Sequence, residues 1–213
     1  MTIKAVIWDF GGVFTESPFE AFARYEAERG LPKDLIRKVN TINPDANAWA
    51  RFERAEIDAA GFDAAFLEES SALGHPTPGR EVLPLIHGPI RPRMVAALTA
   101  CKQRFKVGCI TNNMASEHSP GGGMSAAGQI MAQFDALIES SKAGVRKPDP
   151  RIYRMMCELL AVAPRDCVYL DDLGINCKPA AALGMTAIKV VGVDQALGEL
   201  AAATGLVFQG EPA

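Results

Sequence analysis

The sequence has no apolar stretch long enough to cross a lipid bilayer, so a transmembrane protein is not expected. Its amino terminus runs into a strand-like segment rather than into the basic and then apolar layout of a signal peptide, and we therefore expect a cytoplasmic protein. The chain also has no dense run of lysine and arginine, and its formal net charge is −3. These absences argue against nucleic acid and membrane partners.

Paired cysteine motifs are absent as well. The chain has five cysteines, an odd number, and they lack the close paired spacing of a zinc site. All of them lie in or beside apolar segments: Cys101, Cys109, Cys157, Cys167 and Cys177. We expect reduced cysteines that serve as packing residues.

The overall composition is that of a globular protein. With 213 residues, 48% of them apolar and 22% charged, the chain can build one core, or one core plus a smaller module. After the first third, strand-like and helix-like segments alternate, which predicts an α/β fold with a parallel sheet between layers of helices. The predicted strands are residues 5–8, 106–110, 136–139, 167–170 and 186–191. The predicted helices between them include residues 93–103, 151–160 and 179–183.

Residues 17–85 contain no convincing strand. Phe19, Phe22 and Tyr25 recur at helical spacing before Gly30, and further segments suit helices: residues 35–39, 46–57 and 62–73. We predict a helical cap domain here, inserted after the first strand into a core domain of residues 1–16 and 86–213. A cap over a site excludes water and selects substrates, whereas the alternative is a helical extension without a catalytic role.

Polar residues follow three of the predicted strands, and another lies in the turn before a predicted helix. Four segments in order supply them: Asp9, Thr111, Lys147, and the pair Asp171 and Asp172. Ligands of open parallel sheets bind beyond the carboxyl ends of the strands, so these groups are predicted to meet. Taken singly, Asp9, Thr111 and Lys147 also suit an ordinary turn, loop or solvated position. Adjacent acids at the end of an apolar strand repel each other unless a cation or a proton relieves them.

The predicted cluster requires a metal ion to bind phosphate. Asp9, Asp171 and Asp172 bring three carboxylates together, and Lys147 is the one fixed cation in these motifs. A phosphate dianion would be repelled by such a cluster at low dielectric. Oxygen ligands without cysteine or histidine point to Mg²⁺.

These residues predict phosphoryl transfer to a carboxylate. Asp9 is the candidate nucleophile, and the amides of Phe10 and Gly11 would face the equatorial oxygens of the phosphoryl group. Thr111 and the amide of Asn112 could bind further phosphate oxygens, as stabilisation of this transition state requires. The expected partner is a small phosphorylated molecule.

Several motifs together resemble the haloacid dehalogenase (HAD) superfamily. They are Asp9-Phe10-Gly11-Gly12-Val13, Thr111-Asn112-Asn113, residues 134–140, residues 144–153, and residues 169–174 with Lys178-Pro179. Within it, they are most similar to the group that includes the amino-terminal phosphatase domain of soluble epoxide hydrolase. The resemblance implies a Rossmann-like core of three layers with a helical cap.

The resemblance also implies roles for individual residues. Asp9 would be the nucleophile and contact the metal, and the Gly11 carbonyl and the Asp172 carboxylate would bind Mg²⁺. Asp171 would act on the metal directly or through a bound water.

The chain departs from this family at Gly11, where its phosphatases usually carry a second aspartate. That residue protonates the leaving group, and general acid–base help is worth about 10²–10⁴ in rate. Sugar 1-phosphates, acyl phosphates and aryl phosphates are therefore the better candidate substrates. Glu117 and His118 are candidate replacements, and an ordinary exposed loop position is the alternative for each.

Three functions remain open from the sequence. They are a Mg²⁺-dependent phosphatase, a dehalogenase-like hydrolase in which Asp9 attacks carbon, and a catalytically weak phosphate-binding or regulatory protein. Cap residues Trp49, Phe52 and Glu53 are candidates to face the site, although Trp49 and Phe52 are better interpreted as cap core. The run Gly121-Gly122-Gly123 suggests a mobile loop or a simple flexible connection.

Overall fold

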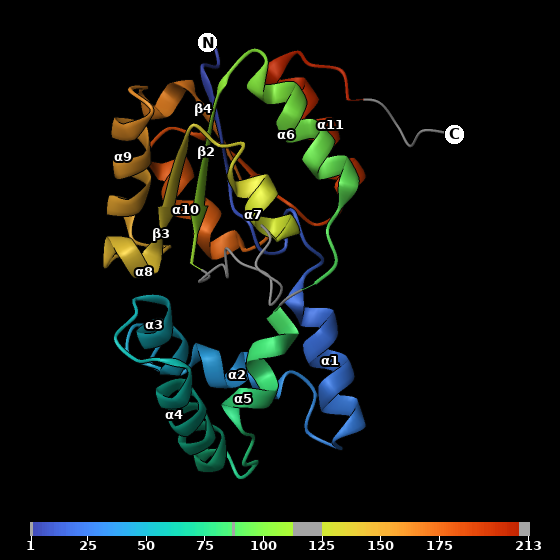
Figure 1. The fold of residues 1–213 in the computed structure, drawn as a ribbon, viewed down its shortest axis with the longest axis vertical. Coiled ribbons are helices and arrows are strands. Elements are labelled where there is room, and N and C mark those ends of the chain that lie inside the picture. Colours follow the sequence, from blue (N-terminus) through green and yellow to red (C-terminus); the bar gives the residue numbers. More distant parts are fainter. Residues whose placement is uncertain (1, 87, 113–124, 209–213) are drawn as a thin grey trace.

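The chain forms a parallel sheet of five strands in the order β3-β2-β1-β4-β5, which Figure 1 shows in a computed structural model. The structure describes residues 2–86, 88–112 and 125–208. The strands are β1 (Ala5–Trp8), β2 (Lys106–Thr111), β3 (Ala136–Glu139), β4 (Cys167–Asp171) and β5 (Thr186–Lys189). All five predicted strands are present, and β1 and β3 have the predicted ends.

The prediction for β5 was too long by two residues. Val190 still donates its amide to the carbonyl of Asp171, but the amide of Val191 bonds to the side chain of Gln195 instead of a neighbouring strand. Gly192 then caps the next helix, α11 (Val193–Thr204). β5 therefore ends at Lys189, because the two residues after it already lead into α11.

Helices cover both faces of the sheet, as the three-layer prediction required. Side chains alternate along β1, so Val6 and Trp8 pack on one face while Ala5 and Ile7 pack on the other. The first face is covered by α6 (Pro92–Lys102), α7 (Ala126–Met131) and α11, and the second by α9 (Pro150–Leu159) and α10 (Gly174–Ala182). The remaining short pieces are α8 (Ser140–Ala143) and the 3₁₀ turn η2 (Pro164–Asp166).

Helix α10 begins five residues earlier than the predicted start at Pro179, which lies inside it. The Asp171 carboxylate accepts a hydrogen bond from the amide of Leu173, the residue before the helix, and so fixes its start. Proline cannot donate to the carbonyl four residues earlier, but the rest of the helix continues through it.

The five cysteines are buried and none forms a disulfide, which confirms their role in packing. Within the described ranges, no helix combines the length and the apolar content that a membrane crossing requires.

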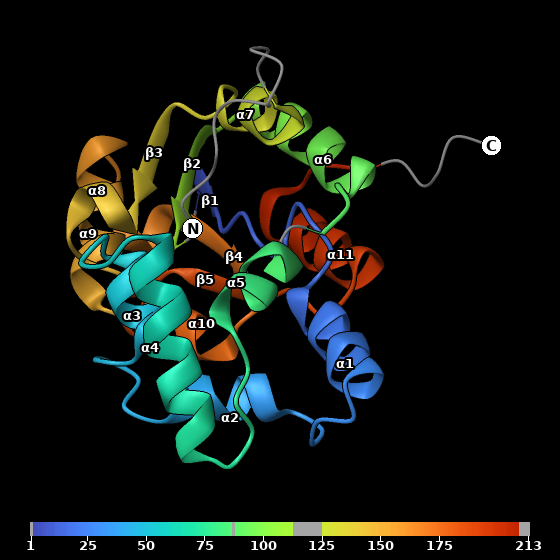
Figure 2. The ribbon, with the colours of Figure 1, turned by 60° about the horizontal axis from the view of Figure 1, so that its bottom comes forward.

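Residues 17–86 form a separate group of helices. They are α1 (Pro18–Glu28), α2 (Leu35–Thr41), α3 (Ala48–Glu53), α4 (Ala59–Ala72), α5 (Gly79–Val82) and the 3₁₀ turn η1 (Leu83–Ile86). They have a hydrophobic cluster of their own around Phe62 and Phe66, and they contain no strand. Figure 1 shows this group beneath the carboxyl ends of the strands, and Figure 2 shows it in front of them.

Helix α3 is shorter than the predicted helix over residues 46–57. The Asn47 side chain accepts a hydrogen bond from the amide of Ala50 at 2.9 Å and so caps the first turn. After Glu53 the helix ends, and Ala55 takes a left-handed backbone with φ of 56°. The local capping and the left-handed turn therefore define a helix of six residues.

The chain enters and leaves this helical group at neighbouring points. Thr15 and Ile90 form an antiparallel bridge, and the amide of Glu16 donates to the carbonyl of Pro89 at 3.0 Å. The amide of Arg91 donates to the carbonyl of Phe14 at 2.7 Å. These hydrogen bonds tie the two connections together directly below β1.

Candidate active site

Asp9 and Lys147 form a buried ion pair at the carboxyl edge of the sheet. Asp9 directly follows β1, and Lys147 lies in the loop before α9. Lys147 Nζ is 2.7 Å from Asp9 Oδ1 and 2.8 Å from Asp171 Oδ2, and its side chain is 1% exposed. The lysine thus joins two carboxylates that are far apart in the sequence.

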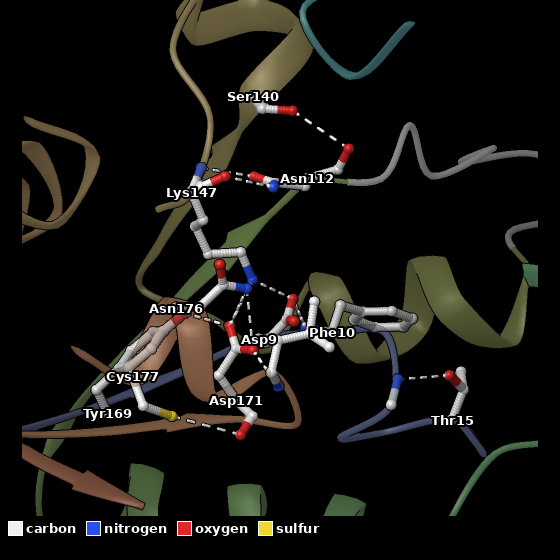
Figure 3. A network of polar contacts seen from close by, with 12 residues as sticks. Asp9, Phe10, Thr15, Asn112, Ser140, Lys147, Tyr169, Asp171, Asn176 and Cys177 are labelled. Carbon is white, nitrogen blue, oxygen red and sulfur yellow. Dashed lines mark hydrogen bonds and ion pairs between the residues drawn. The ribbon is translucent and has the colours of Figure 1, made fainter. Parts of the chain in front are cut away.

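The carboxylate of Asp171 has partners at both oxygens (Figure 3). Oδ2 accepts from the Tyr169 hydroxyl at 2.5 Å, and Oδ1 accepts from the Leu173 amide at 2.8 Å. The amide nitrogen of Asn176 lies 3.1 Å from each oxygen. Because this carboxylate is also fully buried, it is fixed in place and holds Lys147 against Asp9.

Asp172 faces the glycine turn that follows Asp9. Gly12 has a left-handed backbone with φ of 70°, and a Cβ at this position would lie 2.2 Å from Asp172 Oδ2. Arg91 donates from Nη1 to the Gly12 carbonyl at 2.9 Å, and Ser17 Oγ lies 3.5 Å from Asp172 Oδ2. The positive φ of Gly12 and the close approach of Asp172 therefore both require glycine at position 12.

The second polar segment supports the loop that carries Lys147. Thr111 ends β2 and is fully buried. The Asn112 side chain accepts from the Lys147 amide at 2.9 Å and donates to the Lys147 carbonyl at 3.0 Å. Asn112 therefore pairs with the backbone of the lysine in both directions.

The electrostatics of the site favour a further cation. Burial raises the pKa of Asp9 well above its usual value, and the charges of Asp171 and Asp172 add to this although Lys147 opposes it. Burial, followed by the charge of Asp171, also raises the pKa of Asp172, to about 6. Burial alone would lower the pKa of Lys147, but Asp171 and Asp9 raise it, so the lysine stays charged.

The three carboxylates can share a metal ion. Asp9, Asp171 and Asp172 each offer an oxygen, and these oxygens lie within 4.8 Å of one another. One lysine cannot neutralise all three, and the donors are oxygen atoms, which suits Mg²⁺. The donor set and the charge deficit fit the metal that the sequence predicts.

The backbone next to Asp9 makes one contact that the sequence did not indicate. The Phe10 amide, expected to face phosphate oxygens, donates to Asp9 Oδ1 at 2.6 Å. Gly11 follows at the turn, and Gly12 rather than Gly11 has the positive φ. Phosphate binding by the amides of Phe10 and Gly11 stays a prediction.

Sequence reasoning missed two residues that hold Asp171. Tyr169 lies two positions before Asp171 on β4, so the alternation of side chains along a strand could have indicated it. Asn176 lies on α10, and its contact depends on a helix start that the sequence did not reveal.

The cap candidates separate into two kinds. The ring centroids of Trp49 and Phe52 lie 4.7 Å and 5.2 Å from that of Phe62, so both belong to the hydrophobic cluster of the helical group, as expected. Glu53 instead contacts the sheet domain, where its Oε2 lies 2.6 Å from Arg146 Nε. Glu117, His118 and the run Gly121-Gly122-Gly123 lie outside the described residues.

Comparison with known proteins identifies the family. The family model of haloacid dehalogenase-like hydrolases matches residues 3–184. The chain belongs to this family. As a haloacid dehalogenase-like protein it is a hydrolase, in agreement with the resemblance of its motifs.

Two relatives of this haloacid dehalogenase-like hydrolase extend over most of the chain. It is 30% identical over 232 residues to bifunctional epoxide hydrolase 2 of Sus scrofa, covering 100% of this chain and 41% of that protein. It is 29% identical over 194 residues to a sesquiterpene phosphatase of Aspergillus oryzae, covering 88% of this chain and 89% of that protein. The chain therefore spans less than half the length of the first relative.

The fold is shared with solved structures. A HAD family enzyme of Bacteroides thetaiotaomicron, solved in complex with magnesium and inorganic phosphate, superposes with a TM-score of 0.59 at 19% identity. The match covers 88% of this chain and 93% of that one. At this identity the likeness establishes the Rossmann-like α/β fold of the family.

Proposed function

We propose that this hydrolase is a Mg²⁺-dependent phosphatase that cleaves a small-molecule phosphate monoester through an aspartyl-phosphate. The observation that carries the proposal is the cluster of three carboxylates around the buried ammonium of Lys147. Such a site needs a metal before it can accept a phosphate dianion. The sesquiterpene phosphatase among the relatives supports phosphorus rather than carbon as the reaction centre.

In the proposed reaction, Asp9 attacks phosphorus in line with the leaving oxygen. Lys147 neutralises charge on the nucleophile and on the phosphoryl oxygens, and Asp171 keeps the lysine in position. Thr111 and the amide of Asn112 bind further phosphoryl oxygens. The transfer requires positioning and charge stabilisation above all, and these residues supply both.

We propose that Asp9, Asp172 and the carbonyl of Gly11 hold the Mg²⁺. Asp171 acts on it directly or through a water, and its four protein partners favour the second arrangement. When bound, the ion neutralises negative charge on the phosphoryl group and fixes its orientation.

We propose that residues 17–85 act as the cap domain and residues 1–16 and 86–213 as the core domain. The helical group has its own hydrophobic cluster and lies over the carboxyl edge of the sheet. A cover at this place keeps water from the reacting atoms and contacts the part of the substrate that leaves.

Asp9→Asn tests the proposed nucleophile. We expect the rate of phosphate release to fall at least about 10³-fold in this variant, because an amide cannot form the aspartyl-phosphate. Inorganic phosphate is measured with p-nitrophenyl, acyl and sugar phosphates, each with Mg²⁺ and with excess chelator. Asp194→Asn, which changes an acid that is 87% exposed, is the matched control and should behave as wild type. Retained Mg²⁺-dependent turnover in Asp9→Asn would contradict the mechanism.

The absence of a carboxylate at Gly11 favours a second candidate, a phosphate-binding protein with little turnover. A folded wild-type protein that binds inorganic phosphate and Mg²⁺ but releases no phosphate from any ester would support it. Halide release from halo acids without Mg²⁺ would instead indicate that Asp9 attacks carbon.

A further inference from the structure

Glu53 brings a carboxyl group from the cap to the sheet domain. It is the last residue of α3, and its backbone carbonyl accepts a hydrogen bond from Ser140 Oγ at 2.5 Å. Its side chain is 14% exposed and lies 2.6 Å from Arg146, measured from Oε2 to Nε. Arg146 also donates from Nη1 to the carbonyl of Pro44 at 2.9 Å. The carboxyl is therefore held at the junction of the two parts of the chain.

The core residues that hold Glu53 adjoin the phosphate-handling groups. Ser140 Oγ is 3.3 Å from the carbonyl of Asn112, and Arg146 immediately precedes Lys147. In Figure 3 Ser140, Asn112 and Lys147 lie along one side of the cluster around Asp9. In Figure 1 α3 lies directly beneath α8, the short helix that begins with Ser140, and the two helices are in contact. Glu53 thus stands where the cap meets the Asn112 and Lys147 side of the site.

The surroundings of Glu53 suit a proton donor at neutral pH. Burial raises the pKa of its carboxyl to about 7, although the charges of Arg146, Lys147 and Arg54 lower it. Arg146 contacts the carboxyl from the loop before α9, the charge of Lys147 in the same loop acts on it without contact, and Arg54 follows Glu53 at the end of α3. A carboxyl with a pKa near the working pH can both give and take a proton.

The position that usually supplies this proton holds no side chain in this protein, because residue 11 is glycine. We propose that Glu53 is the general acid and base of the reaction, delivered by the cap in place of a carboxylate at position 11. The inference rests on the proposed phosphatase function and assigns the residue that acts on the leaving group.

The proposed reaction has two steps, formation and hydrolysis of the aspartyl-phosphate. Asp9 Oδ forms a bond to phosphorus while the bond from phosphorus to the leaving oxygen breaks. That oxygen keeps the electron pair and takes the proton of the Glu53 carboxyl, so the alcohol departs and Glu53 becomes a carboxylate. Glu53 then takes a proton from water, whose oxygen attacks phosphorus and breaks the bond to Asp9. Inorganic phosphate leaves, and both carboxyl groups return to their starting states.

Glu53→Gln tests the assignment through its dependence on the leaving group. We expect kcat/KM for simple alkyl phosphates to fall about 10²–10³-fold, and that for p-nitrophenyl phosphate to fall less than about tenfold, because only the poor leaving groups need the proton. In wild type, kcat/KM for alkyl phosphates should decline above about pH 7, and this decline should be absent in the variant. Glu56→Gln, three residues further along and 49% exposed, is the matched control and should leave both readouts unchanged.

A second variant tests whether Glu53 acts as the general acid, independently of its contacts between the cap and the core. Adding Gly11→Asp to Glu53→Gln should restore turnover of alkyl phosphates, because it supplies a carboxyl at the position where related phosphatases carry one. An equal loss for all leaving groups, or no rescue by Gly11→Asp, would show that Glu53 only joins the cap to the core. Failure of the wild-type protein to release phosphate from any ester would overturn the phosphatase proposal itself.

Discussion

Position 12 requires glycine for two reasons, its backbone conformation and the lack of space for a side chain. Its φ of 70° belongs to the left-handed region, and the space where a side chain would begin is already filled by the carboxylate of Asp172. Conformational strain costs stability wherever it occurs. The clash with Asp172 would in addition move a proposed metal ligand.

We therefore expect Gly12→Ala to lower both stability and Mg²⁺ affinity. The strain should cost about 1 kcal/mol of unfolding free energy, and the displaced carboxylate should raise the Mg²⁺ concentration for half-maximal activity by about 10–100-fold. Urea unfolding and a Mg²⁺ titration of activity measure the two effects. Gly205 is a matched control, since its φ is 71° and no atom lies within 4 Å of a Cβ placed there. If Gly205→Ala changes the Mg²⁺ dependence equally, the clash with Asp172 is not the cause.

Some residues of the candidate site could be predicted from the sequence and others could not. Asp9, Lys147 and Asp171 could be predicted to meet because strand ends and one proline-flanked turn place them at the same edge. Asn176 and Arg91 could not, because their contacts depend on where a helix begins and where the cap returns to the core. The role now proposed for Glu53 likewise requires the packing of α3 against α8, which no local pattern encodes.

At the scale of elements, the helical group owes its shape to aromatic packing. The ring centroids of Trp49, Phe52 and Phe66 lie 4.7 Å, 5.2 Å and 5.5 Å from that of Phe62, which is fully buried. These contacts join α3 to α4. They also hold the end of α3, which carries Glu53.

We expect Phe62→Ala to loosen this group more than the sheet. Loss of the ring should cost about 3–5 kcal/mol of local stability. Hydrogen exchange should accelerate in α3 and α4 and remain slow in β1. Leu67→Ala, on the same helix but 36% exposed, should have a much smaller effect. Equal acceleration in β1 would mean that the helical group and the sheet unfold as one unit.

Elements with a strong local signal could be predicted from the sequence, and those set by tertiary contacts could not. Strands β1 and β3 end where predicted because polar groups follow short apolar runs directly. Helix α10 starts earlier than predicted because the Asp171 carboxylate fixes its first turn, and that contact is invisible in the local sequence. The parallel order of the strands agrees with the alternating pattern of strands and helices.

For the whole molecule, the carboxylate cluster is a source of instability that a cation relieves. Three carboxylates lie together with one buried lysine, and burial with mutual repulsion raises the pKa of Asp9 and Asp172. A ligand that binds the native state alone stabilises it by mass action. Folding stability and metal binding are therefore coupled.

We expect Mg²⁺ to raise the melting temperature of the wild-type protein. At one hundred times Kd the gain is about 2.7 kcal/mol, or about 5–10 °C for a chain of this size. Differential scanning calorimetry with Mg²⁺ and with chelator measures it. Asp172→Asn should melt higher than wild type in chelator and lose the response to Mg²⁺, whereas Asp194→Asn should keep it. A wild-type melting temperature that does not respond to Mg²⁺ would contradict the proposed metal site.

The two connections below β1 run side by side and share hydrogen bonds between Glu16 and Pro89 and between Phe14 and Arg91. Everything between these pairs of residues leaves and re-enters the sheet domain at almost the same place. A different helical cover could be grafted at this point without disturbing the order of the strands, provided that it again brings a carboxyl to the place of Glu53. We expect that the proposed active site can thus be given a new choice of substrates by exchanging one continuous piece of the chain.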